Sequence, residues 1–218
     1  MFFVIDGSDG SGKATQVALL KERLLQEGRK VETIDFPKYS SNTFGALIRE
    51  CLDGKRGDFM QIDPRIASAL YAADRFESSG QIREWLEGGT VVIADRYVSA
   101  NMLHQGAKLT DETERADFLN WIDEVEHGVF GIPRPDLIMY LEVPFAVRKG
   151  LLAGDGSRKA LDLAELDEAH QTATETAAQS LVAGLNNWQK IACTVEGVLR
   201  AREDIHEEIY RTVRQVLL

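Results

Sequence analysis

A glycine-rich stretch near the start of the chain, GSDGSGKATQ at residues 7–16, constrains the fold more than any other part of the sequence. It follows the apolar run FFVID and precedes QVALLKERLLQEG, in which apolar residues recur at helical spacing up to Gly28. In a strand, glycine loop and helix of this kind, backbone N–H groups and the positive end of the helix dipole surround a phosphate. The stretch predicts a nucleotide-phosphate site, with a plain glycine-rich turn as the alternative.

The loop departs from the usual pattern G-x-x-x-x-G-K-[ST] because Ala14 follows Lys13 and the hydroxyl comes one position later, at Thr15. Ala14 has no oxygen to offer Mg²⁺. This ion usually keeps several waters and takes few protein ligands, so we expect nucleotide phosphates, water and a nearby carboxylate to hold it, with Asp9 as the leading candidate. The predicted ATP-binding residues are Gly7, Ser8, Asp9, Gly10, Ser11, Gly12, Lys13, Ala14 and Thr15.

Short β-rich runs alternate with longer helical segments along the rest of the chain. The runs VETID, TVVIAD and DLIMYLEV are typical of strands, and KIACTVEG more weakly so. Helical spacing marks residues 64–86, 111–126, 162–185 and 202–218. Strands separated by helices favour parallel pairing, which predicts one α/β sandwich domain over residues 1–218. The segment AGDGSRK, at residues 153–159, is the best candidate for a mobile loop.

Composition narrows the class of partner and the compartment. The 25 Lys and Arg residues against 35 Asp and Glu give a formal charge of −10, which disfavours binding to polynucleotides. The two cysteines, Cys51 and Cys193, lie far apart among apolar residues, as small buried thiols do. These features, with no apolar run of membrane-spanning length and no leader-like segment, lead us to expect a cytoplasmic protein that is not membrane-bound.

A second polar motif follows the third strand run, where TVVIA is succeeded by DRYVSANMLHQGAK. Asp95 and Arg96 therefore fall at the carboxyl end of a parallel strand, where open α/β sheets bind ligands. Asp95 could orient metal-bound water, and Arg96 could clamp a phosphate through paired hydrogen bonds. The alternative is a surface ion pair at the end of a strand.

The motifs together resemble the thymidylate kinase family of nucleoside monophosphate kinases. The resemblance rests on GSDGSGKATQ, FPKY at residues 36–39, ALYAADR at 69–75, DRYVSANMLHQG at 95–106 and RPDLIMYLEV at 134–143. It covers residues 1 to about 145 in order and resumes weakly in the last strand and helix. It implies a P-loop NTPase-type three-layer sandwich, with a five-stranded parallel sheet between helices and a small mobile lid at about residues 148–168.

The resemblance also implies a set of acceptor-binding residues. In the family, an aromatic ring stacks on the pyrimidine and an arginine four residues later binds its carbonyl edge; these positions are Tyr71 and Arg75 here. The alternatives without a role in binding are a core tyrosine and a surface arginine. His104 stands where the family commonly has an aromatic ring near the sugar, so the preference for deoxyribose stays open. The full dTMP-binding set implied is Asp9, Phe36, Tyr39, Tyr71, Arg75, Arg96, Asn101 and His104.

For catalysis, the resemblance implies transfer driven by alignment and cations. The expected catalytic residues are Asp9, Lys13, Arg96 and Arg158, with Asp9 and Asp95 as metal ligands, and Arg148 and Lys159 as alternatives to Arg158 in the lid. The acidic residues after Arg158, namely Asp162, Glu165 and Asp167, roughly keep the family's spacing, although a solvated helix face would have the same composition.

The sequence thus predicts a Mg²⁺-dependent kinase that makes dTDP from ATP and dTMP. A nucleotide-binding module with altered specificity or little turnover is the first alternative, and a deoxynucleoside kinase that phosphorylates a 5′-hydroxyl is the second. Family members are usually homodimers, and the helix predicted over residues 64–86 has enough apolar positions to form the interface.

Overall fold

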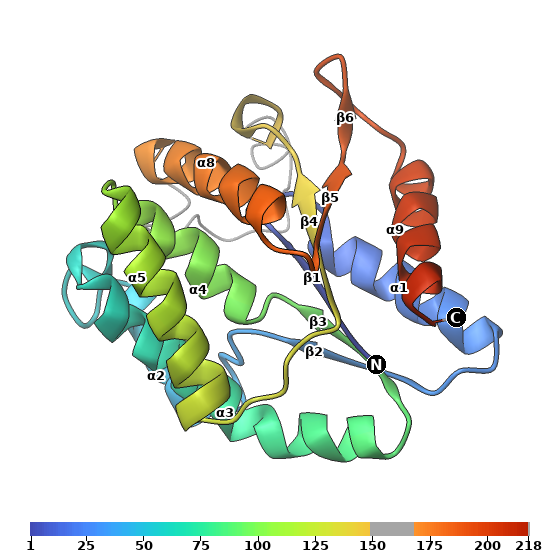
Figure 1. Ribbon diagram of the computed structural model, residues 1–218, viewed down its shortest axis with the longest axis horizontal. Coiled ribbons are helices and arrows are strands. Elements are labelled where there is room, and N and C mark those ends of the chain that lie inside the picture. The colour runs from blue at the N-terminus through green and yellow to red at the C-terminus, as the bar shows by residue number, and fades with distance from the viewer. Residues whose placement is uncertain (149–167, 218) are drawn as a thin grey trace.

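A parallel β-sheet forms the centre of the molecule (Figure 1), and its five strands lie in the order β2-β3-β1-β4-β5. The computed structural model describes residues 1–148 and 168–217. The strands of this sheet are β1 (Phe2–Gly7), β2 (Val31–Asp35), β3 (Val91–Asp95), β4 (Leu137–Glu142) and β5 (Trp188–Ala192). Because every pair in the sheet is parallel, the carboxyl ends of all five strands meet at one edge.

Helices connect the strands and cover both faces. They are α1 (Lys13–Gln26), α2 (Thr43–Leu52), α3 (Pro64–Glu87), α4 (Val98–His104), α5 (Glu112–Asp123), α8 (Glu168–Gly184) and α9 (Arg202–Leu217). Between them lie two short 3₁₀ turns, η1 (Phe59–Gln61) and η2 (Gly106–Lys108), and one π-helical turn, η3 (Glu124–Val129). A two-stranded hairpin, β6 (Thr194–Val195) with β7 (Val198–Leu199), projects from the end of the sheet.

The central strand shows why both faces need covering. All six residues of β1 are buried, and their side chains alternate between the two faces of the sheet. Phe2 and Val4 belong to the apolar cluster under α3, α4, α5 and α8, whereas Phe3 and Ile5 belong to the cluster under α1 and α9. Figure 1 shows the same division, with α1 and α9 on one side of the sheet and the other helices opposite. The predicted three-layer architecture is confirmed.

The described elements depart most from the predicted ones in three places. The weak fifth strand lies at Trp188–Ala192, earlier than the predicted run, whose end forms the hairpin instead. The predicted helix over residues 111–126 ends as an α-helix at Asp123 and continues as η3. Helix α2 was not predicted. The part of the predicted 162–185 helix before Glu168 lies outside the described residues.

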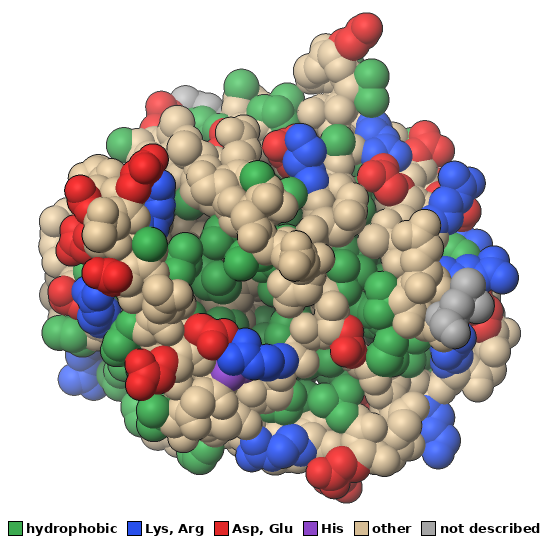
Figure 2. Space-filling view, viewed as in Figure 1, with side chains coloured by type: hydrophobic (Ala, Val, Ile, Leu, Met, Phe, Trp, Pro, Cys, Tyr) green, Lys and Arg blue, Asp and Glu red, His purple; other side chains and the backbone are tan. Residues whose placement is uncertain are grey.

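The surface carries charges of both signs. On the face in Figure 2, acidic and basic side chains are interspersed, and apolar side chains line a hollow near its centre. Both cysteines are buried and unbridged, as the sequence indicates. Among the helices that the structure describes, none is long and apolar enough to span a bilayer.

Candidate active site

A cavity of about 760 Å³ opens at the carboxyl edge of the sheet. This volume is within the range of small-molecule sites. Most of the residues predicted for ATP, metal or dTMP line it: Asp9, Gly10, Ser11, Gly12, Lys13, Ala14, Thr15, Phe36, Tyr39, Tyr71, Arg75, Asp95, Arg96, Asn101 and His104. Gly7 and Ser8 do not line it, and Arg158 lies outside the described residues. One cavity therefore unites two motifs that are far apart in the sequence.

The loop between β1 and α1, residues 7–13, is called the phosphate loop here. Gly10 and Gly12 have φ angles of 78° and 89°, in the left-handed region that favours glycine. A Cβ on Gly7 would lie 2.7 Å from Ser11 Oγ and 2.9 Å from the Leu141 carbonyl oxygen, too close for any other residue. The loop's glycines are thus required by its own geometry, and α1 begins at its last residue with its N-terminus toward the cavity.

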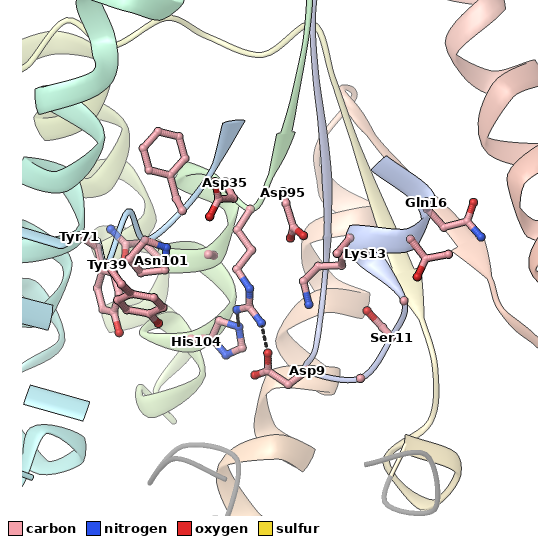
Figure 3. Close-up of a pocket in the computed structure, with 18 of the residues that line it drawn as sticks. Asp9, Ser11, Lys13, Gln16, Asp35, Tyr39, Tyr71, Asp95, Asn101 and His104 are labelled. Atoms are coloured by element: carbon pink, nitrogen blue, oxygen red, sulfur yellow. Dashed lines mark hydrogen bonds and ion pairs between the residues drawn. The ribbon is translucent and has the colours of Figure 1, made fainter. Parts of the chain in front are cut away.

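Lys13 is the buried cation of this loop. Its Nζ donates to the carbonyl oxygen of Ser8 at 3.0 Å. Burial and the positive charge of Arg96 lower the pKa of Lys13, while the carboxylates of Asp9 and Asp95 oppose that shift. Figure 3 shows Lys13 and Ser11 on one side of the cavity, with Tyr39, Tyr71 and Asn101 on the other.

Arg96 links these two sides. One guanidinium nitrogen, Nη2, donates to Asp9 Oδ1 at 2.5 Å, and Nη1 lies 3.0 Å from His104 Nε2. Burial by itself would lower the pKa of Arg96, but the carboxylates of Asp9, Asp6 and Asp95 raise it, so the side chain keeps its charge. Its φ of 65° is uncommon for a residue with a side chain and fits a position held by surrounding structure.

Carboxylates at the ends of two neighbouring strands also face the cavity. Asp95 ends β3 and Asp35 ends β2, paired in register. Burial raises the pKa of Asp95, and the positive charges of Lys13 and Arg96 partly offset this. Both strand ends therefore bring negative charge to the edge where ligands bind in open α/β sheets.

The predicted metal ligands fit an ion that is held largely by phosphates. Within the part of the chain that the structure describes, His, Cys, Asp and Glu form no cluster of three or more able to enclose a metal. Asp9 and Asp95 nevertheless both offer oxygen atoms to the cavity, and Mg²⁺ prefers oxygen ligands while retaining water. This donor set suits Mg²⁺ that arrives with a nucleotide.

The opposite side of the cavity is aromatic and polar. Tyr71 and Arg75 are one helical turn apart on α3, as predicted, and Tyr39 lies beneath the Arg49 guanidinium at 5.4 Å. Phe36 is buried against Tyr97, with ring centroids 5.7 Å apart. The alternative of a surface arginine is wrong, because Arg75 is buried. Tyr71 lines the cavity and also packs against an apolar cluster that contains Phe59.

Arg148, the predicted alternative to Arg158, does not line the cavity. It is buried and donates to the carbonyl oxygens of Val143 at 2.9 Å and Asp9 at 3.3 Å. Further bonds at 2.9 and 2.8 Å reach Gln171 and Glu175 on α8. Arg148 thus connects the phosphate loop to α8 through hydrogen bonds made outside the cavity. Lys159 and the acidic residues Asp162, Glu165 and Asp167 lie outside the described residues.

Several residues that line the cavity are not among those that the sequence motifs predict. Asp35 ends a strand just as Asp95 does, so the rule about carboxyl ends could have found it. Gln16 belongs to the quoted loop motif, and its Nε2 donates to the Arg202 carbonyl oxygen at 3.0 Å. Lys108 and Arg200 also line the cavity, but no local pattern in the sequence separates them from surface cations.

Comparisons with known proteins give the same family that the sequence motifs resemble. The family model described as thymidylate kinase matches residues 5–209. A thymidylate kinase of Mycobacterium tuberculosis is 34% identical over 158 residues, which is 72% of this chain and 71% of the relative. A probable thymidylate kinase of Thermococcus onnurineus is 30% identical over 228 aligned positions, covering 100% of this chain and 99% of the relative.

The fold has a counterpart among solved structures. A thymidylate kinase from Candida albicans superimposes with a TM-score of 0.72, covering 98% of this chain and 91% of the other, at 23% sequence identity. At that identity, the likeness supports the fold alone.

Proposed function

Because the chain belongs to the thymidylate kinase family, we propose that its cavity holds ATP and dTMP end to end and transfers the γ-phosphoryl group to dTMP, giving ADP and dTDP. The observation that carries the proposal is the single cavity in which the phosphate loop, Arg96 and an aromatic pocket meet. Phosphoryl transfer needs two polyanions aligned among cations, and this cavity supplies cations at the junction between its two sides.

On the donor side, the backbone N–H groups of the phosphate loop and the start of α1 hold the ATP phosphates. Lys13, buried beside them, neutralises charge on the outer phosphates. Asp9 and Asp95 would hold Mg²⁺ together with the phosphates and water, and the ion would neutralise charge as it develops on the transferred group. The hydroxyl of Thr15 contacts the α-phosphate.

On the acceptor side, Tyr71 stacks on the base and Arg75 donates to its carbonyl edge, with Asn101 beside them. Phe36 and Tyr39 enclose the nucleotide. Arg96 binds the acceptor phosphate, so a nucleotide that already carries a phosphate should be a better acceptor than a nucleoside.

The remaining parts of the proposal concern the lid, the assembly and the compartment. Arg158 supplies the further cation from the lid, whose closure excludes water.

The protein works in the cytoplasm as a homodimer joined through α3. Phe76 on α3 is 48% exposed and lies 5.3 Å from Phe130 between ring centroids, beside Val129, which is 72% exposed. An apolar surface patch of this kind favours association. Phe76→Glu should shift the sedimentation coefficient from that of a dimer to that of a monomer.

The test of the activity is an assay of ADP release with ATP and Mg²⁺, in which dTMP, dUMP, UMP, dCMP and thymidine are offered separately. Release with dTMP and not with thymidine supports the proposal. Release with thymidine alone would instead establish a nucleoside kinase. Nucleotide binding without release would establish a binding module.

A further inference from the structure

A buried carboxylate, that of Glu126, lies behind the acceptor side of the cavity without lining it. Its two oxygens accept hydrogen bonds from Arg75, one from Nη2 and one from Nε, both at 2.6 Å. The two side chains are only 2% and 1% exposed. Paired bonds between a planar guanidinium and a carboxylate fix the orientation of both groups, so Glu126 decides where Arg75 can point.

The same carboxylate fixes Asn101. The Asn101 Nδ2 atom donates to Glu126 Oε1 at 2.8 Å and to the Ser68 carbonyl oxygen at 3.1 Å. An ionised carboxylate only accepts hydrogen bonds, so it holds the amide nitrogen toward itself and turns the amide oxygen, Oδ1, away. Since Asn101 lines the cavity, Glu126 determines which end of this amide a ligand meets.

Arg75 can still donate hydrogen bonds to a ligand, and the carboxylate of Glu126 neutralises its positive charge. Besides its bonds to Glu126, its Nη1 donates to the Tyr97 carbonyl oxygen at 3.1 Å. A guanidinium has five N–H groups, so donors remain after these three bonds. Because Glu126 balances the charge, this end of the cavity suits a neutral base more than a phosphate, which Arg96 is placed to bind.

The local fold explains how Glu126 reaches this position. It lies in the π-helical turn η3, where the Phe130 N–H donates to the Val125 carbonyl oxygen at 2.9 Å. The wider turn interrupts the α-helical register after α5, and π-turns of this kind are frequent at functional sites. Glu126 is buried while Glu124, two positions earlier in the same turn, is exposed.

From this arrangement we infer that Glu126 is a positioning residue that sets the hydrogen-bond polarity of the acceptor pocket. It presents Arg75 as donor and Asn101 Oδ1 as acceptor, which matches a pyrimidine whose carbonyl group adjoins a ring N–H, as in thymine and uracil. Cytosine offers the opposite pattern, an amino donor beside a ring acceptor. This inference rests on the proposed function, because it concerns the acceptor of that reaction.

The test compares Glu126→Gln with the wild type and with the matched control Glu124→Gln. The amide introduced by Glu126→Gln can donate an N–H where the carboxylate only accepts, so the side-chain amide of Asn101 is free to flip. Arg75 also loses its charged partner. We expect the ratio of kcat/KM for dTMP to that for dCMP to fall about tenfold or more, with the KM for ATP within about twofold of the wild type. The control should retain the wild-type ratio.

Glu126→Asp provides a second variant, because removing the charge from a buried pair can unfold a protein. It keeps the charge but shortens the side chain, so the paired bonds to Arg75 are lost and the ratio should again fall. Thermal unfolding identifies which variants are folded.

An unchanged ratio in either folded variant would overturn the inference. So would an equal loss of kcat with every acceptor, which indicates a merely structural role. If the wild type does not turn over dTMP, the proposed function fails, and calorimetric binding of dTMP and dCMP to the same proteins then decides the polarity separately.

Discussion

Arg96 Nη2 lies 2.5 Å from Asp9 Oδ1, and through this pair the acceptor side of the cavity is joined to the phosphate loop. Asp9 follows β1 and Arg96 follows β3, and these strands are neighbours in the sheet with Ile5 in register with Asp95. The sheet thus brings together a cation and a carboxylate 87 positions apart in the sequence. In the proposed reaction, this pair lies between the ATP phosphates and the phosphate of dTMP.

Replacing Arg96 tests the importance of that position. Arg96→Ala removes a fixed cation from the place where charge develops, so we expect kcat to fall by about 10²–10³ or more. Steady-state kinetics with dTMP measures this loss, and circular dichroism checks that the fold persists. Arg211→Ala is the control, because Arg211 is exposed on α9. Near-normal turnover of Arg96→Ala would contradict the assignment.

Lys13 should be equally important on the donor side. Lys13→Ala removes the cation nearest the outer phosphates, and we predict a loss of activity of about 10²–10³ together with weaker ATP binding. Calorimetric titration with ATP separates binding from turnover. Lys30→Ala, at an exposed position, should match the wild type. Full ATP affinity and turnover in Lys13→Ala would show that the phosphate loop does not hold the donor.

The residue after Lys13 tests how the metal is held. Ala14 lines the cavity and is exposed, so a hydroxyl at this position has room and could add a ligand to Mg²⁺. We expect Ala14→Ser to leave the Mg²⁺ concentration for half-maximal activity unchanged or to lower it. A Mg²⁺ titration at saturating ATP measures this value. Collapse of activity would mean that the small side chain is required.

Asp95 connects the site with stability and pH. Burial raises its pKa, so the folded protein binds this proton more tightly than the unfolded chain does. The stabilising contribution of that proton is complete below the ordinary pKa of aspartate, and it is lost as the pH rises through the raised pKa. Asp95→Asn removes a buried negative charge and should raise the free energy of unfolding at pH 7 by about 1 kcal/mol while impairing turnover.

Urea unfolding of wild type and Asp95→Asn between pH 4 and pH 8 measures this effect, with the difference between them growing toward higher pH. Glu124→Asn, at an exposed position, serves as the control and should follow the wild type. Lower stability of Asp95→Asn at pH 7 would contradict this prediction. It would mean that the attraction of the Asp95 carboxylate to Lys13 and Arg96 outweighs the cost of burying its charge.

The parts of the fold that the sequence predicts well are those with a local physical cause. The apolar runs predict strands β1, β3 and β4, and the spacing of the glycines predicts the phosphate loop, without information from the rest of the chain. Helix α2 was missed because its packing is decided elsewhere: a Cβ on Gly45 would lie 2.1 Å from the Lys38 carbonyl oxygen, and Asp74 on α3 accepts from the Lys38 N–H at 3.0 Å.

The sequence likewise predicts those site residues that lie in or directly after a strand. The phosphate loop and the Asp95–Arg96 pair follow strands, so the topology alone places them at one edge. Glu126 had no such signal, because in EVEHG nothing distinguishes the buried glutamate from the exposed Glu124. Only the π-helical turn and the buried partner, Arg75, set the two apart.

Following the phosphoryl group itself shows whether this protein is a dTMP kinase. ATP labelled in the γ-phosphate is mixed with dTMP, Mg²⁺ and the purified protein, and the labelled products are separated by chromatography. If the protein transfers the γ-phosphoryl group to dTMP, the label appears in dTDP, at a rate that depends on dTMP and is lost in Arg96→Ala. Label recovered only as inorganic phosphate, or retained in ATP, would contradict it.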